Sequence, residues 1–148
     1  IVKGVHDVAV RFSKCCNPVP GDDIVGFVTR GRGVSIHRAD CINVMKMAQD
    51  DRSRLIDAKW ESETSTGGEK YTADIKIFAN DRNGLLADIS RVLAENNIDI
   101  MSMNTRTSKQ GLATMETSFQ VTSREELKRV IDKIRTIDSI IDIERATG

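Results

Sequence analysis

The second half of the chain changes its hydrophobic period repeatedly, and this restricts the fold more than any other feature of the sequence. Apolar and polar residues alternate over 71–79, which is the pattern of a half-buried strand. Apolar residues then recur on one helical face over 85–93. Segments 98–107 and 112–122 have the composition of two strands, and the glycine-containing loop 108–111 joins them as a hairpin. The pattern therefore predicts the order β-α-β-β.

The remaining residues predict a second helix and a last strand. Ser123 and Glu126 form a capping-box pattern, which marks a helix N-terminus. Apolar residues follow it at helical spacing: Leu127, Val130, Ile131 and Ile134. Residues 140–146 have the composition of a strand. The complete order is β-α-β-β-α-β, a ferredoxin-like arrangement in which two helices cover one face of an antiparallel sheet. Such a sheet has edges that can pair with another chain.

A polar segment separates this region from the residues before it. Residues 61–70 are rich in Gly, Ser and Thr and have no periodicity, which is typical of a flexible linker. The linker divides the chain into domains 1–60 and 71–148. The first domain combines short alternating strands with turn clusters, and we predict a short helix at 39–47 and a closing strand at 55–60. It has few large apolar residues, so its core is small for independent folding. We predict an α+β protein in which a small β-rich cysteine domain, stabilised by a metal or a partner, precedes the ferredoxin-like domain.

Composition restricts the class of partner and the compartment. The 148 residues contain 22 basic and 22 acidic side chains, so nucleic acid or membrane contact would require a local patch. No apolar run reaches the roughly 18 residues of a membrane span, which predicts a soluble, cytosolic protein without a membrane partner. An odd number of cysteines, three, favours metal binding or free thiols over a secreted disulfide framework. The chain begins at Ile1, and we interpret it as a fragment of a longer protein.

All the cysteines and one of the two histidines lie in one short segment of the first domain. Thiolates and imidazole are preferred ligands of structural zinc, and three cysteines with one histidine form a known tetrahedral class. The candidate metal ligands are Cys15, Cys16, His37 and Cys41. The adjacent pair lacks the usual spacer, so both thiols can bind one ion only where the Pro18/Pro20 turn twists the backbone.

Other uses of the same thiols remain open at this point. Free cysteines are often small buried hydrophobic residues, and a vicinal disulfide would have strained geometry. A thiol enzyme would need an exposed thiolate whose pKa is lowered by a neighbouring cation such as Lys14. Against catalysis, the sequence has no C-x-x-C or G-x-S-x-G motif.

A basic cluster accompanies the predicted hairpin of residues 24–37. Its glycines would let a phosphate backbone approach closely, and its arginines offer bidentate donors, so RNA contact is one interpretation. The candidate RNA-contact residues are Lys14, Arg30, Arg32 and Arg38. The alternative is an ordinary solvated turn, which the absence of interleaved aromatic residues favours.

The loop between the first strand and the first helix of the second domain is a candidate ligand site. Backbone amides at that helix N-terminus could receive the carboxylate of an amino acid. The candidate residues are Asn80, Asp81, Asn83, Gly84 and Leu85. The alternative is that the Asn-Gly pair is only the turn and cap that start the helix.

Two stretches of sequence resemble known domains. Residues 11–41, which read RFSKCCNPVPGDDIVGFVTRGRGVSIHRADC, closely resemble the conserved-cysteine, or zinc-finger, domain of RelA/SpoT-type (p)ppGpp synthetase/hydrolases. The second domain is similar to the ACT domain that ends those proteins, with the sequence DRNGLL at 81–86 where the family has a D-R-x-G-L-L turn. Asn83 stands where many ACT domains have proline. Together the resemblance covers nearly the whole chain.

The resemblance implies a function that neither periodicity nor spacing provides. It implies the non-catalytic C-terminal regulatory tail of a stringent-response enzyme, whose parent protein resembles GTP diphosphokinase and guanosine-3',5'-bis(diphosphate) 3'-diphosphatase. In that family the tail contacts the ribosome and its RNA and controls the catalytic domains. The same resemblance implies structural zinc on the four candidate ligands and a homodimer through the ACT domain. The alternative function is a branched-chain amino-acid sensor, because ACT domains often bind small amino acids at the helix-start loop.

Overall fold

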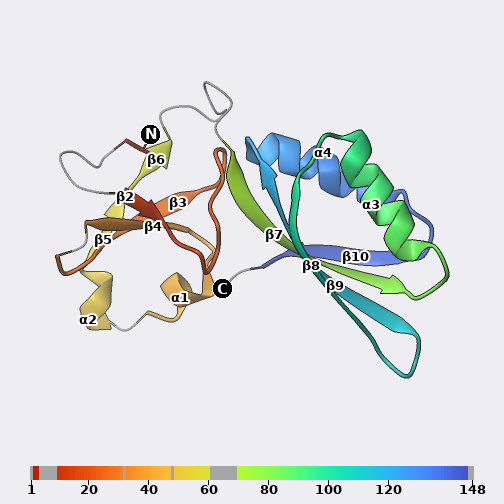
Figure 1. Ribbon diagram of the computed structural model, residues 1–148. Coiled ribbons are helices and arrows are strands. Elements are labelled where there is room, and N and C mark those ends of the chain that lie inside the picture. The colour runs from red at the N-terminus through yellow and green to blue at the C-terminus, as the bar shows by residue number, and fades with distance from the viewer. Residues whose placement is uncertain (1, 4–9, 32, 48, 61–69, 147–148) are drawn as a thin grey trace.

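The computed structural model describes residues 2–3, 10–31, 33–47, 49–60 and 70–146, which form two sheet-based parts (Figure 1). The first part has a four-stranded sheet in the order β2-β4-β3-β5. Its strands are β2 (Val10–Phe12), β3 (Ile24–Val28), β4 (Val34–Arg38) and β5 (Leu55–Asp57). Strands β3 and β4 form the predicted antiparallel hairpin, whereas β2 pairs with β4 in parallel.

Short elements complete the first part. Strand β1 (Val2–Lys3) pairs with β6 (Lys59–Trp60), and two single-turn helices, α1 (Ile42–Met45) and α2 (Gln49–Arg52), precede β5. The closing strand that the sequence predicts at 55–60 is thus divided, because β5 pairs with β3 and β6 pairs with β1. The helix predicted at 39–47 is reduced to α1.

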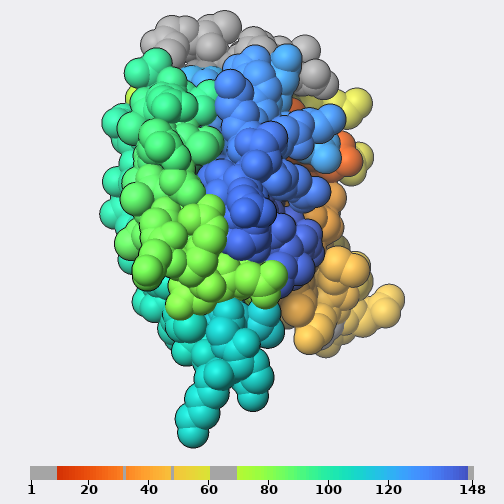
Figure 2. Space-filling model, turned by 90° about the vertical axis from the view of Figure 1, so that its right-hand side faces the viewer, coloured from red at the N-terminus to blue at the C-terminus, as the bar shows by residue number. Residues whose placement is uncertain are grey.

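The second part has the predicted β-α-β-β-α-β order. Its elements are β7 (Tyr71–Asn80), α3 (Leu85–Glu95), β8 (Ile100–Thr107), β9 (Leu112–Val121), α4 (Arg124–Arg135) and β10 (Ile140–Arg145). The antiparallel sheet has the order β10-β7-β9-β8, which leaves β8 and β10 at its edges. Both helices lie side by side against one face, and the β8–β9 hairpin projects beyond them (Figure 2). The prediction of a ferredoxin-like domain is confirmed.

Alternation along the strands explains how this domain buries its core. Residues at 73, 75, 77 and 79 of β7 are buried under the helices, while their neighbours are only half-buried. Helix α3 contributes Leu85, Ile89 and Leu93, and α4 contributes Leu127, Val130 and Ile134. Full burial of each such side chain stabilises the fold by about 1.5–3 kcal/mol. The described residues of the first part form two much smaller clusters, one of Ile24, Val34, Ile36 and Ala58 and one of Cys16, Cys41 and Val44.

The two parts meet at a loop of the first part, residues 17–22. Val19 in this loop is fully buried and belongs to the hydrophobic cluster of the second part. The backbone N–H of Arg124, at the start of α4, donates to the carbonyl oxygen of Pro20 at 2.7 Å. The loop therefore packs into the second part as well as belonging to the first. Among the helices that the structure describes, none is long and apolar enough to cross a membrane.

Candidate metal centre

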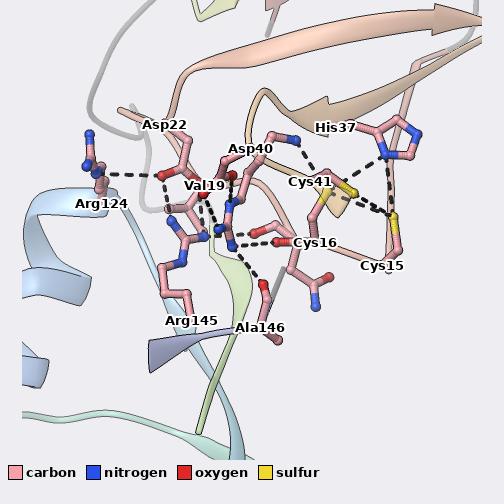
Figure 3. A network of polar contacts seen from close by, with 12 residues as sticks. Cys15, Cys16, Val19, Asp22, His37, Asp40, Cys41, Arg124, Arg145 and Ala146 are labelled. Carbon is pink, nitrogen blue, oxygen red and sulfur yellow. Dashed lines mark hydrogen bonds and ion pairs between the residues drawn. The ribbon is translucent and has the colours of Figure 1, made fainter. Parts of the chain in front are cut away.

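The structure brings the four candidate ligands together from three separate segments (Figure 3). Cys15 and Cys16 lie in the turn after β2, His37 lies on β4, and Cys41 immediately precedes α1. Their donor atoms all lie within 4.8 Å of one another. This arrangement fulfils the spatial requirement that the sequence alone left open for the adjacent cysteines.

Four of the six distances between the donor atoms are close to those of a tetrahedral zinc site, and the other two are within 4.8 Å. With a Zn–S bond of about 2.3 Å, tetrahedral geometry separates two sulfur atoms by about 3.8 Å and a sulfur from a nitrogen by about 3.5 Å. The Sγ atom of Cys15 lies 3.5 Å from that of Cys41 and 4.0 Å from that of Cys16. The Nδ1 atom of His37 lies 3.4 Å from Cys15 Sγ and 3.8 Å from Cys16 Sγ. The four residues can therefore hold a tetrahedrally bound zinc ion.

A local turn lets the adjacent cysteines face the same point. The N–H of Asn17 donates to the carbonyl oxygen of Ser13 at 3.0 Å, which closes a helical turn around both thiols. Asn17 then takes a left-handed φ of 45° and redirects the chain. Successive side chains on a helical turn diverge by about 100° rather than 180°. Convergence is therefore possible without the proline-directed twist that the sequence suggested.

Burial affects the proton equilibria of the ligands. Burial raises the pKa of the Cys16 thiol to about 12, so the thiol is not ionised near neutral pH unless a cation lies beside it. Burial also opposes ionisation of Cys15, but hydrogen bonds, led by that from Ser13, hold its pKa below the ordinary value. Burial lowers the pKa of His37, which keeps its imidazole neutral and able to bind a metal. A zinc ion bound here would ionise the thiols, because a metal-bound thiol loses its proton.

Arg38, one of the RNA-contact candidates, is instead part of the support around the ligands. Its backbone N–H donates to Cys16 Sγ at 3.3 Å, and its guanidinium, with a side chain only 5% exposed, donates to the carbonyl oxygens of Cys16 and Ala146. The carboxylate of Asp40 accepts from Nε and Nη2 of Arg38 at 2.9 and 2.8 Å. A guanidinium held in this way is not available to RNA phosphate in this conformation. In the sequence, the only nearby residue that could have indicated this structural role of Arg38 is Asp40, two residues further along.

The other RNA-contact candidates have different positions. Lys14 and Arg30 are exposed, and Arg32 lies outside the described residues. Lys14 and Lys70 border a pocket of about 480 Å³ between the two parts, together with Phe12, Tyr71 and Met101. The ring of Phe12 stacks on Trp60 with centroids 5.4 Å apart, and both rings meet Tyr71 edge-on. Sequence reasoning missed this aromatic cluster, because its members are 48 and 11 residues apart in the order Phe12, Trp60, Tyr71.

The candidate ligand loop of the second part is closed by contacts within its own domain. The N–H groups of Asn80 and Asp81 donate to the carbonyl oxygens of Ser139 and Gly111 at 2.9 and 2.8 Å. Gly84 is the N-cap of α3 with a left-handed φ of 81°, and no side chain caps the helix there. Asn80, Asp81, Asn83 and Gly84 are exposed, whereas Leu85 is buried in the core. The turn explains the Asn-Gly pair without requiring a ligand.

Comparisons with known proteins agree with both parts of the structure. A model of the RelA/SpoT RIS domain family matches residues 1–61, and a model of the ACT domain family matches residues 67–145. The chain is 37% identical over 149 aligned residues to the GTP pyrophosphokinase of Escherichia coli strain K12, covering 100% of the chain and 20% of that protein. It is 36% identical over 147 residues to the bifunctional (p)ppGpp synthase/hydrolase RelA of Mycobacterium tuberculosis, covering 99% of the chain and 19% of that protein.

A solved structure is similar to the second part. The ACT domain from the GTP pyrophosphokinase of Chlorobium tepidum superposes with a TM-score of 0.47 at 25% identity, covering 52% of the chain and 99% of that domain. The chain spans about a fifth of the length of the two curated relatives above.

The fold and the matched families together define a regulatory region in which a cysteine-containing RIS domain precedes an ACT domain, which is not a catalytic domain. The chain belongs to the ACT domain family through residues 67–145, its residues 1–61 match the RelA/SpoT RIS domain, and over its whole length it is homologous to the C-terminal region of GTP pyrophosphokinases.

Proposed function

We propose that this chain is the non-catalytic regulatory tail of a cytoplasmic stringent-response (p)ppGpp synthetase/hydrolase, with structural zinc at its four-ligand centre. It places the parent enzyme on ribosomal RNA and controls the parent's catalytic domains. The observation that carries the proposal is the convergence of three thiols and one imidazole within 4.8 Å of one another, in a small domain with little apolar core. Zinc bound there would supply the folding free energy that such a core lacks, since a structural metal binds the folded state.

Zinc stoichiometry tests the metal half of the proposal. Native mass spectrometry of the protein should show one zinc per chain, which a chelator removes. His37→Asn should lose the zinc, and His6→Asn is the matched control because it removes the other histidine of the chain. A wild-type protein that stays folded and metal-free at saturating zinc would contradict this half.

The RNA half is supported by the position of Lys14 beside the aromatic pocket. Phe12 is 37% exposed and shares the pocket with two lysines. Aromatic rings beside cations form the stacking and phosphate-binding combination that RNA-binding surfaces use. Phe12 and Lys14 are close in the sequence, and so are Lys70 and Tyr71, but more than fifty residues separate the two pairs, so the sequence did not indicate that they share one pocket.

Salt dependence tests the RNA half. Each phosphate contact on duplex RNA should contribute roughly 0.9 to the slope of log K against log salt, by analogy with B-DNA. We therefore expect Lys14→Gln and Arg30→Gln each to lower the slope for a ribosomal RNA fragment by about one. Lys128→Gln, an exposed charge removed from α4, should leave it unchanged. Equal slopes for the wild type and all three variants would rule out RNA binding through Lys14 and Arg30.

Self-association through the ACT domain is a further component of the proposal. Strand β8 is an edge strand, and Met101 within it is 56% exposed, so a second copy could add its own edge strand there. Sedimentation should show a dimer that Met101→Lys weakens. Met45→Lys is the matched control, since Met45 is 64% exposed on α1 in the other domain. A monomer at every concentration would exclude the dimer.

The second candidate function is a branched-chain amino-acid sensor. The observation that favours it is the N-terminus of α3, where Gly84 provides no side-chain cap for the first backbone amides. Calorimetry with valine and leucine is the direct test. A flat titration at millimolar ligand would remove this function and leave the RNA proposal intact.

A further inference from the structure

One loop connects the metal centre with the ACT domain. It begins at the two adjacent cysteine ligands and continues directly into residues 17–22, which pack against the second part (Figure 3). Val19 is 0% exposed among core residues of the ACT domain, and Pro20 accepts the N–H of Arg124. The position of two of the four ligands is therefore tied to the docking of this loop.

A buried charge fixes the far end of the loop. The carboxylate of Asp22 accepts from Arg145 on β10 at 2.6 and 3.0 Å, and Arg124 on α4 lies 3.8 Å away. Within the loop, the same carboxylate accepts the N–H of Val19 at 2.9 Å. Arg145 also donates to the carbonyl oxygen of Asn17. Both cations belong to the ACT domain, so these two ion pairs of Asp22 form only while the two domains are docked.

Arg38 forms a second connection between the two domains, and it contacts the loop where the loop begins, at Cys16. Its N–H supports the Cys16 sulfur, and its Nη1 bridges the carbonyl oxygens of Cys16 and Ala146 at 3.3 and 2.9 Å. It follows the ligand His37 directly on β4. A single guanidinium thus joins a metal ligand of the first domain to the residue that follows the last strand of the second.

We propose that Arg38 is a positioning residue of the metal centre, and that docking of the ACT domain through Arg145 and Asp22 tunes its metal affinity. This inference rests on the proposed zinc site. Because coupling between two binding events is reciprocal, zinc must strengthen docking by the same factor by which docking strengthens zinc binding. The ACT domain and the metal centre then respond to each other, although all four candidate ligands among the described residues belong to the first domain.

Metal affinity of the complete chain tests the coupling. In competition with a chromophoric chelator, Arg145→Gln should weaken zinc binding on the order of tenfold, within the usual range of such couplings. Among the described residues Arg145 reaches Asp22 and Asn17 rather than any metal ligand. The matched control is Arg129→Gln, an exposed arginine of the same domain on α4. Arg38→Ala should weaken zinc by about ten- to a hundredfold, as supporting contacts of metal ligands do.

A double variant separates positioning from a general loss of stability. If Arg38 and Arg145 act through one connection, combining Arg38→Ala with Arg145→Gln should weaken zinc little more than Arg38→Ala alone. Independent effects would multiply instead. Multiplied losses in metal affinity would overturn the proposed connection even if both single variants bind zinc poorly.

Hydrogen exchange at the Arg124 amide measures docking itself, because its acceptor is Pro20 in the other domain. Zinc removal and Arg145→Gln should both speed this exchange, while the Leu127 amide, bonded within α4 to Ser123, stays protected. If Arg145→Gln leaves Arg124 protected, Val19→Ser provides a second way to weaken docking. Unchanged zinc affinity in a variant whose Arg124 amide is deprotected would overturn the inference. Failure of the wild type to bind zinc would instead overturn the proposed function.

Discussion

At the scale of single residues, Gly21 shows how closely the two domains approach each other. Its φ of +104° is unfavourable for any L side chain, and an added Cβ would lie 3.0 Å from the Cβ of Arg124. Gly111 has a similar φ of +82° but open space around it. We expect Gly111→Ala to lower the free energy of unfolding by about 1–2 kcal/mol through φ alone. Gly21→Ala should cost more, because it also separates the loop from α4.

Denaturant unfolding of both variants measures this difference. Equal losses at the two glycines would mean that the close approach at Gly21 does not contribute to stability.

The two glycines also show a limit of sequence reasoning at this scale. Both glycines occur in recognisable turns, but only Gly21 meets a residue more than a hundred positions away.

The metal ligands and Arg38 also differ in how far local sequence predicts their contacts. The ligand set was predictable because thiol and imidazole chemistry is restricted to few uses, and all four residues lie within one segment. Arg38 looked like a solvent-exposed member of a basic cluster. Its actual partner, the carbonyl oxygen of Ala146, is 108 residues away, so no local pattern could indicate it.

At the scale of elements, the start of α4 supports both its own helix and the interface. Ser123 Oγ accepts the N–H of Glu126 at 3.2 Å, and the Glu126 carboxylate accepts the N–H of Thr122. Loss of an N-cap side chain typically costs about 1 kcal/mol. We expect Ser123→Ala to destabilise the protein by about that amount and Ser123→Thr to retain most of the stability, as measured by denaturant unfolding. Equal losses would show that the hydroxyl does not cap the helix.

Elements were predictable where one period persists and a sheet face is buried. Strand β7 and helices α3 and α4 are long amphipathic elements, and the structure confirms each of them. The segment at 55–60 is different, because its apolar pattern continues while its pairing partner changes from β3 to β1. Pairing depends on residues distant in sequence, so the break was not predictable from local composition.

At the scale of the whole molecule, the contrast between the two cores predicts how the chain responds to metal loss. Among the described residues, the main apolar cluster of the first domain has four buried members, whereas the cluster of the ACT domain has sixteen of its own together with Val19 from the first domain. Apolar burial is the main favourable contribution to folding, so the ACT domain should remain folded without metal. The first domain should not, because binding of a structural metal contributes directly to the folding of small domains.

The single tryptophan allows this response to be followed. Trp60 belongs to the first domain but contacts Tyr71 of the second, whereas the two long helices α3 and α4 both belong to the ACT domain. We expect a chelator to shift Trp60 emission to the red while the far-ultraviolet circular dichroism of these helices largely persists. Cys41→Ser should reproduce the shift without a chelator. Trp60 emission that does not change when mass spectrometry shows complete zinc loss would mean that the first domain is held by the ACT interface and not by its metal.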